Sequence, residues 1–207
     1  MDGTLIDSND ALEVTWQRWA AERGVAFEHI RRVHHGRLPA ETISIVAPHL
    51  DAAAEARLIY AEQDAITEGI HPIAGANDFF RSVPAHRAAI VTAATLRILH
   101  RRLRLVGIDA PTVCVTADSV RCGKPDPEGY LDAARRLGYE PQACVVFEDA
   151  PTGLVAAHRA GMRAVGILSN YTEAGLRAEL GAGETPVAFI RDFRGVTLDG
   201  TALTLPG

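Results

Sequence analysis

Residues 143–168 of this 207-residue chain read ACVVFEDAPTGLVAAHRAGMRAVGIL, and their pattern predicts the class of fold. The apolar run over 143–147 is typical of a strand, and the helical periodicity of 152–160 ends at Gly161. A second apolar run covers 164–168. Strand, helix and strand at this spacing predict two parallel strands joined by a right-handed crossover.

The same alternation continues on both sides of this stretch. It predicts strands over 88–91, 113–115 and 187–190 and helices over 96–106, 127–137 and 172–180. Such a pattern is typical of a doubly wound α/β fold with a parallel sheet.

The region between Ser8 and Ile70 differs, because it holds helical patterns over 11–22, 40–46 and 52–66 and no convincing strand. We therefore predict an α/β core formed by residues 1–8 and 71–207, with a helical cap inserted over residues 9–70.

The composition excludes several classes of protein. Apolar residues make up 47% and charged residues 23%, as in an ordinary folded protein. A net charge of −5 provides no basic field for nucleic acid.

No apolar run reaches the roughly 18 residues of a membrane span, and no leader sequence is evident, so we expect a cytoplasmic protein that does not bind membranes. Three cysteines without metal-site spacing indicate reduced thiols. We expect a small-molecule partner and a monomer or weak dimer.

Four polar clusters lie at or just beyond predicted strand ends: Asp2-Gly3-Thr4, Thr92, Lys124 and Glu148-Asp149. Ligands of open α/β sheets bind outside the carboxyl ends of the strands, so these clusters are expected to converge. Lys124 is the only lysine among 21 basic residues. An ammonium is a compact point charge that the planar guanidinium does not always replace.

In order and spacing, the clusters resemble the four signature motifs of the haloacid dehalogenase-like superfamily. The first motif matches Met1–Ser8 (MDGTLIDS), and the second matches Thr92 at the end of its strand. The third matches Gly123–Pro127 (GKPDP), and the fourth matches Val146–Gly153 (VFEDAPTG). The resemblance spans the chain and implies a Rossmann-like core with a helical cap.

The resemblance also implies a Mg²⁺-dependent phosphatase acting on a small phosphorylated metabolite. Asp149, with Glu148 directly or through water, would hold the metal, and Asp2 would contribute its backbone carbonyl. The Asp2 side chain would act as general acid and base. A plain turn at Asp2 and a helix N-terminal pair at Glu148-Asp149 are the alternatives.

Phosphate binding is implied for three further residues. Lys124 would contact the phosphate oxygens, while the Thr92 hydroxyl and the Ala93 N–H would donate hydrogen bonds to the transferring group. A divalent cation and an ammonium on opposite sides would neutralise the dianion before attack. A strand-end cap is the alternative role of Thr92.

The nucleophile of the family is an aspartate two positions before the acid/base aspartate, a position that would precede Met1. We therefore expect the first core strand to be truncated in this sequence. We also expect the sequence as written to lack the carboxylate that forms an aspartyl-phosphate, and so to be inactive.

The placement of the cap resembles the phosphoglycolate phosphatase and β-phosphoglucomutase-like branch. Within it, Thr116–Val120 and Phe147–Pro151 look most like the glycerol-phosphate and 2-deoxyglucose-6-phosphate phosphatases. The cap stretch His35-Gly36-Arg37 is similar to their His-Gly motif, so His35 or Arg37 would read a sugar hydroxyl. A solvated cap surface is the alternative.

Three rival functions remain open. A β-phosphoglucomutase-like isomerase would share the core motifs, but Leu12 and Pro39 stand where mutases of this branch carry a histidine and an arginine. A phosphoglycolate phosphatase is the second rival. A catalytically dead phosphate-binding or regulatory module is the third, and it belongs to a different class. The absence of a cap lysine argues against phosphonate hydrolases.

Overall fold

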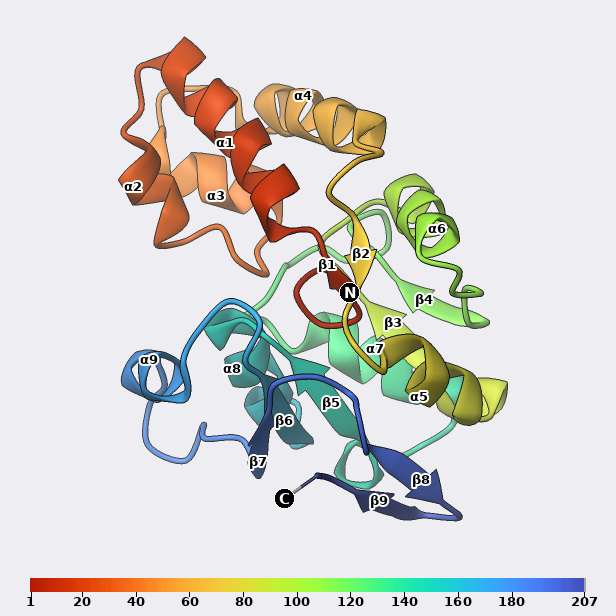
Figure 1. The fold of residues 1–207 in the computed structure, drawn as a ribbon. Coiled ribbons are helices and arrows are strands. Elements are labelled where there is room, and N and C mark those ends of the chain that lie inside the picture. The colour runs from red at the N-terminus through yellow and green to blue at the C-terminus, as the bar shows by residue number, and fades with distance from the viewer. Residues whose placement is uncertain (207) are drawn as a thin grey trace.

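The computed structural model describes residues 1–206 and divides into an upper group of helices and a lower α/β part (Figure 1). The upper group contains α1 (Asn9–Arg23), α2 (Phe27–Arg31), α3 (Pro39–Val46) and α4 (Ala52–Ala65). These helices pack around a hydrophobic cluster of their own, in which Trp16 meets Trp19 edge to face with ring centroids 5.9 Å apart. We call this group the cap.

The lower part, the core, contains the remaining elements. Its strands are β1 (Ile6–Asp7), β2 (His71–Pro72), β3 (Ala89–Val91), β4 (Val113–Val115), β5 (Val145–Glu148), β6 (Arg163–Ile167), β7 (Ala188–Ile190), β8 (Thr197–Asp199) and β9 (Ala202–Thr204). Its helices are α5 (Ala76–Ser82), α6 (Leu96–Leu105), α7 (Glu128–Leu137), α8 (Pro151–Arg159) and α9 (Glu173–Glu179), with 3₁₀ turns at Ala85–Arg87 and Pro141–Ala143.

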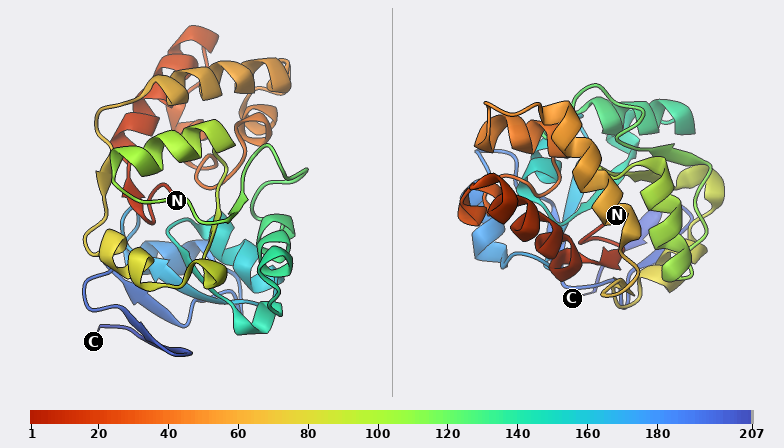
Figure 2. Two further views of the ribbon diagram at one scale, coloured as in Figure 1. Left: turned by 90° about the vertical axis from the view of Figure 1, so that its right-hand side faces the viewer. Right: turned by 90° about the horizontal axis from the view of Figure 1, so that it is seen from above.

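The chain enters and leaves the cap at one place. β1 and β2 pair antiparallel, with Ile6 opposite Pro72 and Asp7 opposite His71. Viewed from the side and from above, α4 of the cap lies over α6 of the core (Figure 2). This connection agrees with an insertion of residues 9–70. The division of the chain into a core of residues 1–8 and 71–207 and a cap of residues 9–70 stays a prediction.

The five strands β3 to β7 pair in parallel, as predicted, whereas the β1–β2 and β8–β9 pairs are antiparallel. β3 pairs with β4, and β5, β6 and β7 form a three-stranded ladder in that order. Among residues 1–206 no strand pairing joins β3 to β5, so the parallel strands form two ladders. The segment before β1 folds into a tight turn, in which the Met1 carbonyl accepts N–H bonds from Thr4, Leu5 and Ile6. Its one strand-like contact is a bridge between Asp2 and Ile6.

Local sequence explains where the helices begin and end. Side chains of Asp51, Thr95 and Thr172 accept N–H bonds at the first turns of α4, α6 and α9. α7 ends at Gly138, whose φ of 76° is left-handed. The predicted core strands and helices lie within about two residues of the observed ones. Helices α2 and α5 were not predicted, because five to seven residues carry too little periodicity. The β8–β9 hairpin was not predicted, because its three-residue strands hold no apolar run.

The main hydrophobic core lies between the strands and α5, α6 and the C-terminal segment. Phe79, Phe147 and Phe193 pack with ring centroids 5.2–5.4 Å apart. This packing holds β5 in place, and the carboxyl end of β5 leads directly to Glu148 and Asp149. Within residues 1–206, no helix combines the length and the apolar character needed to cross a membrane.

Candidate active site

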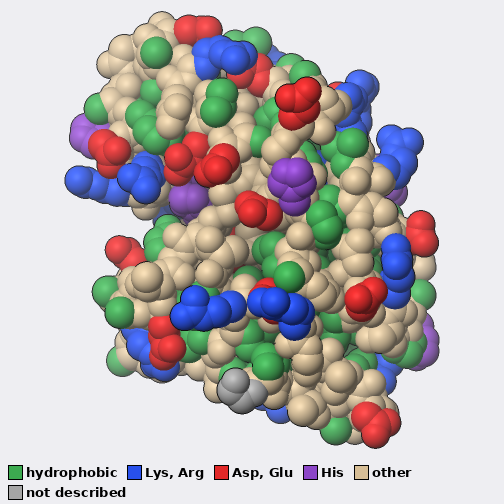
Figure 3. Space-filling model, in the orientation of Figure 1, with side chains coloured by type: hydrophobic (Ala, Val, Ile, Leu, Met, Phe, Trp, Pro, Cys, Tyr) green, Lys and Arg blue, Asp and Glu red, His purple; other side chains and the backbone are tan. Residues whose placement is uncertain are grey.

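A pocket that opens to solvent lies between the cap and the carboxyl ends of β3 and β5. The space-filling view shows a hollow between the two parts of the molecule, on the left of the picture (Figure 3). The structure brings every candidate residue from the sequence to the lining of this pocket: Asp2, His35, Arg37, Thr92, Ala93, Lys124, Glu148 and Asp149. Their chemical roles remain predictions.

Asp149 is a buried carboxylate held by two neutral donors. The Thr4 hydroxyl donates to Oδ1 at 2.9 Å, and the Asn170 amide donates to Oδ2 at 2.6 Å. Burial raises the pKa of Asp149, and the neighbouring Glu148 carboxylate raises it further. No cation of the chain pairs directly with Asp149 among the described residues, so this carboxylate is suited to an external cation.

Glu148 has a different environment. Its Oε1 accepts hydrogen bonds from the Lys124 ammonium and from the Tyr130 hydroxyl, the latter at 2.9 Å. Its Oε2 accepts the backbone N–H groups of Asp149 and Ala150 at 2.9 and 3.1 Å. Burial opposes ionisation, but the Lys124 charge prevails and lowers the pKa of Glu148. Since protein donors satisfy both oxygens, Glu148 positions Lys124 and is poorly placed to bind a metal directly.

Lys124 and the loop after β3 also line the pocket. The Lys124 side chain is only 11% exposed, and its ammonium lies 5.1 Å from the centroid of the Tyr130 ring. The Thr92 N–H donates to the Val115 carbonyl at 2.9 Å, and its hydroxyl accepts the Ala94 N–H at 3.1 Å. These bonds fix the loop, while the hydroxyl of Thr92 keeps its own proton available for a ligand.

Asp2 also lines the pocket and carries an ion pair that sequence reasoning missed. Its Oδ1 accepts the Ser8 hydroxyl and the Arg102 Nη1, each at 2.7 Å. Burial alone would raise the pKa of Asp2, but the Arg102 guanidinium, the Met1 amine and the Ser8 bond together lower it. Asp2 is therefore a carboxylate in this arrangement.

The cap reaches the pocket through the loop between α2 and α3. The His35 carbonyl accepts a hydrogen bond from the Thr152 hydroxyl of α8 at 2.7 Å. Glu41, on α3, accepts the N–H of Gly123 at 2.7 Å, directly beside Lys124. Arg37 lines the pocket, and its buried Nε has no hydrogen-bond partner among the described residues. These contacts hold the cap against the side of the pocket that carries Lys124.

The residues present fit a magnesium ion. Carboxylates and main-chain carbonyls are the oxygen ligands that Mg²⁺ prefers. Asp149 lies directly against the Asp2-Gly3 turn, since a Cβ at Gly3 would fall 2.0 Å from the Asp149 Oδ2. Gly3, with its φ of 69°, is thus the residue that lets this carboxylate and the main chain approach one another.

Several residues of the site lie outside the sequence motifs and were not predicted. Tyr130 and Asn170 lie outside the motifs and have no special spacing. Arg102 occupies the apolar face of α6 beside Ile98, Leu99 and Leu103, all four of them buried. A charge on such a face is the signal that would have found it.

Comparison with known proteins agrees with this geometry. Hexitol phosphatase A of Escherichia coli is 35% identical over 172 residues, covering 81% of this chain and 80% of that protein. The 2-deoxyglucose-6-phosphate phosphatase 1 of Saccharomyces cerevisiae is 30% identical over 193 residues, covering 83% and 78%. CbbY of Rhodobacter sphaeroides, solved in complex with phosphate, superposes with a TM-score of 0.78 at 25% identity over 94% of this chain and 92% of that one. Residues 1–161 match the sequence profile of the haloacid dehalogenase-like hydrolases, and the chain belongs to that family.

Proposed function

We propose that this enzyme hydrolyses phosphate monoesters of small sugars or polyols, with Mg²⁺ as its cofactor. One observation carries the proposal: Lys124, Thr92 and Asp149 line a single pocket that the cap covers. The names of similar proteins, a hexitol phosphatase and a 2-deoxyglucose-6-phosphate phosphatase, support the substrate class. We further propose action in the cytoplasm as a monomer or weak dimer.

Asp149 and the carbonyl of Asp2 would hold the Mg²⁺. When bound, the ion supplies positive charge against the transferring phosphoryl oxygens. Lys124 supplies the second positive charge, and Glu148 fixes its ammonium toward the pocket through their ion pair. The Thr92 hydroxyl and the Ala93 N–H donate to the same oxygens. Positioning and charge stabilisation provide most of the catalysis in such reactions.

Asp2 would protonate the leaving alkoxide and later accept a proton from water. The Arg102 ion pair keeps Asp2 ionised in this structure, which suits the second of these steps. For the first step, Asp2 must hold a proton, so a shift of the guanidinium away from its carboxylate has to accompany substrate binding.

The covalent step needs a carboxylate nucleophile, which in the family stands two positions before the residue equivalent to Asp2. Loss of a nucleophile costs on the order of 10⁶ in rate, about 8 kcal/mol of transition-state stabilisation.

The cap would select the alcohol. His35 and Arg37 face the pocket with polar groups and are our candidates for reading a hydroxyl. Leu12 and Pro39, at the two places where the related mutases carry a histidine and an arginine, also line the pocket. Because neither can transfer a proton or bind a second phosphate, the pocket favours hydrolysis over isomerisation.

The test uses a version of the chain extended upstream by a strand ending in Asp immediately before Met1. Hexitol, 2-deoxyglucose, glycerol and glycolate phosphates are assayed with and without Mg²⁺, next to residues 1–207 alone. Release of phosphate from sugar or polyol esters by the extended version supports the proposal. Conversion of β-glucose 1-phosphate to the 6-phosphate would favour a mutase. An extended version that binds phosphate without turnover would favour a binding module.

A further inference from the structure

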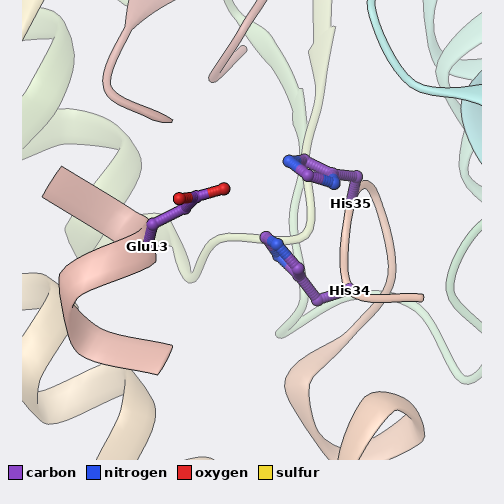
Figure 4. A group of neighbouring side chains, drawn as sticks. All are labelled: Glu13, His34 and His35. Atoms are coloured by element: carbon purple, nitrogen blue, oxygen red, sulfur yellow. The ribbon is translucent and has the colours of Figure 1, made fainter. Parts of the chain in front are cut away.

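Three side chains of the cap lie close together. The proposed reaction does not require the three of them together. Glu13 comes from α1, and His34 and His35 come from the loop between α2 and α3. One ligand atom of each lies within 4.8 Å of the others. Figure 4 shows the carboxylate and both imidazoles pointing toward the same space. We propose that Glu13, His34 and His35 bind a divalent transition-metal ion such as Zn²⁺ or Co²⁺, at a site distinct from that of Mg²⁺.

The donor types favour this class of ion. Two imidazole nitrogens and one carboxylate oxygen form a ligand set that Zn²⁺ commonly takes, whereas Mg²⁺ takes oxygen ligands. Zn²⁺ bonds of about 2.0–2.1 Å place tetrahedral ligands roughly 3.4 Å apart. Small rotations of the three side chains therefore suffice to close the present separations.

The environment of His34 supports a ligand role. Its Nε2 is buried and has no hydrogen-bond partner among residues 1–206. Its ring lies between Trp16, with centroids 5.8 Å apart, and His35, with centroids 4.0 Å apart. Burial lowers the pKa of His34 to about 3, so the ring is neutral at physiological pH, as a metal ligand must be.

His35 is oriented from outside the cluster. Its Nδ1 lies 3.5 Å from the Tyr171 hydroxyl. Partners of this kind fix the ring of a metal-binding histidine. Glu13 has a competitor, since Arg31 Nε lies 3.7 Å from its Oε1. The Arg31 side chain is 58% exposed, however, and is free to turn into solvent when a cation binds.

The proposed metal site shares two residues with the lining of the pocket. His34 and His35 line it, so a bound ion would fix both rings on its wall. His35 is in addition our candidate for reading the substrate, and it cannot serve both partners at once. The metal site itself does not rest on the proposed phosphatase function.

The test measures Co²⁺ binding to the full 207-residue chain by visible absorption, with Mg²⁺ in excess and in an Asp149→Asn background that removes the active-site carboxylate. We expect one Co²⁺ per chain. Affinity should fall about 10–100-fold in Glu13→Gln and further in His34→Asn/His35→Asn. The exposed His49 provides the matched control, and His49→Asn should bind Co²⁺ like the parent.

A second measurement needs no variant of the cluster. Zn²⁺ is added to ¹⁵N-labelled parent chain, and the imidazole nitrogens are followed by NMR. Selective shifts of His34 and His35 support the site, as does a rise in the unfolding temperature with Zn²⁺. Equal Co²⁺ affinity in the parent and in His34→Asn/His35→Asn, or Zn²⁺ shifts confined to other histidines, would overturn it.

Discussion

The Nη1 of Arg102 lies 2.7 Å from the Oδ1 of Asp2, and this ion pair joins the buried face of α6 to the turn that carries the proposed acid and base. Arg102 is 2% exposed, so the pair is shielded from solvent on the arginine side. Two further nitrogens of its guanidinium, Nε and Nη2, have no partner among the described residues. The arginine is thus held at the pocket by a single carboxylate.

Replacing Arg102 by methionine should leave the Asp2 charge buried without a counter-ion. Breaking such a pair costs about 3–5 kcal/mol. Above the unfolded pKa of an aspartate the intact pair contributes in full, and it is lost as pH falls through the lowered pKa of Asp2. The difference in unfolding free energy between parent and Arg102→Met should therefore be large at pH 7 and shrink below pH 4.

Urea unfolding at several pH values measures this difference. The exposed Arg104 on the same helix gives the control, and Arg104→Met should change stability by less than about 0.5 kcal/mol. A constant difference between parent and Arg102→Met from pH 7 to pH 3.5 would show that the loss arises from packing and not from the ion pair.

Lys124 should matter to catalysis through its charge and shape. In the extended version, Lys124→Met should reduce kcat/KM by about 10³-fold, about 4 kcal/mol, because one of the two cations facing the phosphate is lost. Lys124→Arg should restore little, since a planar guanidinium does not fit the space of an ammonium between Glu148 and the pocket.

The double variant Lys124→Met/Glu148→Gln separates the two roles of this lysine. Removing the Glu148 charge together with its partner should recover most of the stability lost in Lys124→Met, without recovering activity. Recovery of phosphatase activity in the double variant would contradict a direct contact between Lys124 and the phosphate.

Asp149→Asn tests the magnesium site. The amide still accepts one of the hydrogen bonds from Thr4 and Asn170, so the fold should persist. Loss of the charge should weaken Mg²⁺ binding by at least about 100-fold, as measured by calorimetry on the 207-residue chain. Glu148→Gln should weaken it less, because protein donors already occupy both oxygens of that side chain.

The order of the elements follows from the sequence because strands and helices of the core have distinct periodicities. β5, α8 and β6 lie where the apolar runs and Gly161 indicate. The division of the sheet into two ladders does not follow, because pairing depends on contacts between strands far apart in the chain. The β8–β9 hairpin was missed because its exposed strands have no apolar run.

The polar motif residues were found because their chemistry stands out at strand ends. Their supporting partners were not, because a tyrosine such as Tyr130 or an asparagine such as Asn170 is unremarkable until the fold places it 2.6–2.9 Å from a carboxylate. The same holds for Glu41, which the sequence shows only as an acidic residue in the first turn of α3.

Glu41 should couple the cap to the phosphate side of the pocket. Its carboxylate accepts the N–H of Gly123, and Glu41→Ala removes this bond beside Lys124. We expect kcat/KM of the extended version to fall about tenfold, mainly through KM, with a small change in stability. The exposed Glu28 serves as the control, and an equal loss in Glu28→Ala would show that the effect does not arise from the contact with Gly123.

His34 should make the folded chain sensitive to mild acid. Burial lowers its pKa from 6.5 to about 3, so below pH 6.5 the unfolded chain binds a proton that the folded chain excludes. Stability should then fall with decreasing pH, with a limiting slope of about 1.4 kcal/mol per pH unit from this group. Between pH 6.5 and 4.5 we expect a loss of about 2 kcal/mol. His34→Gln should remove this part of the pH dependence, while His49→Gln should keep it.

Chemical unfolding of the parent, His34→Gln and His49→Gln chains at pH 7, 5.5 and 4.5 measures this pH dependence. Parallel curves for the parent and His34→Gln would contradict the prediction. They would mean that His34 gains its proton without opening the cap, through entry of water beside Trp16.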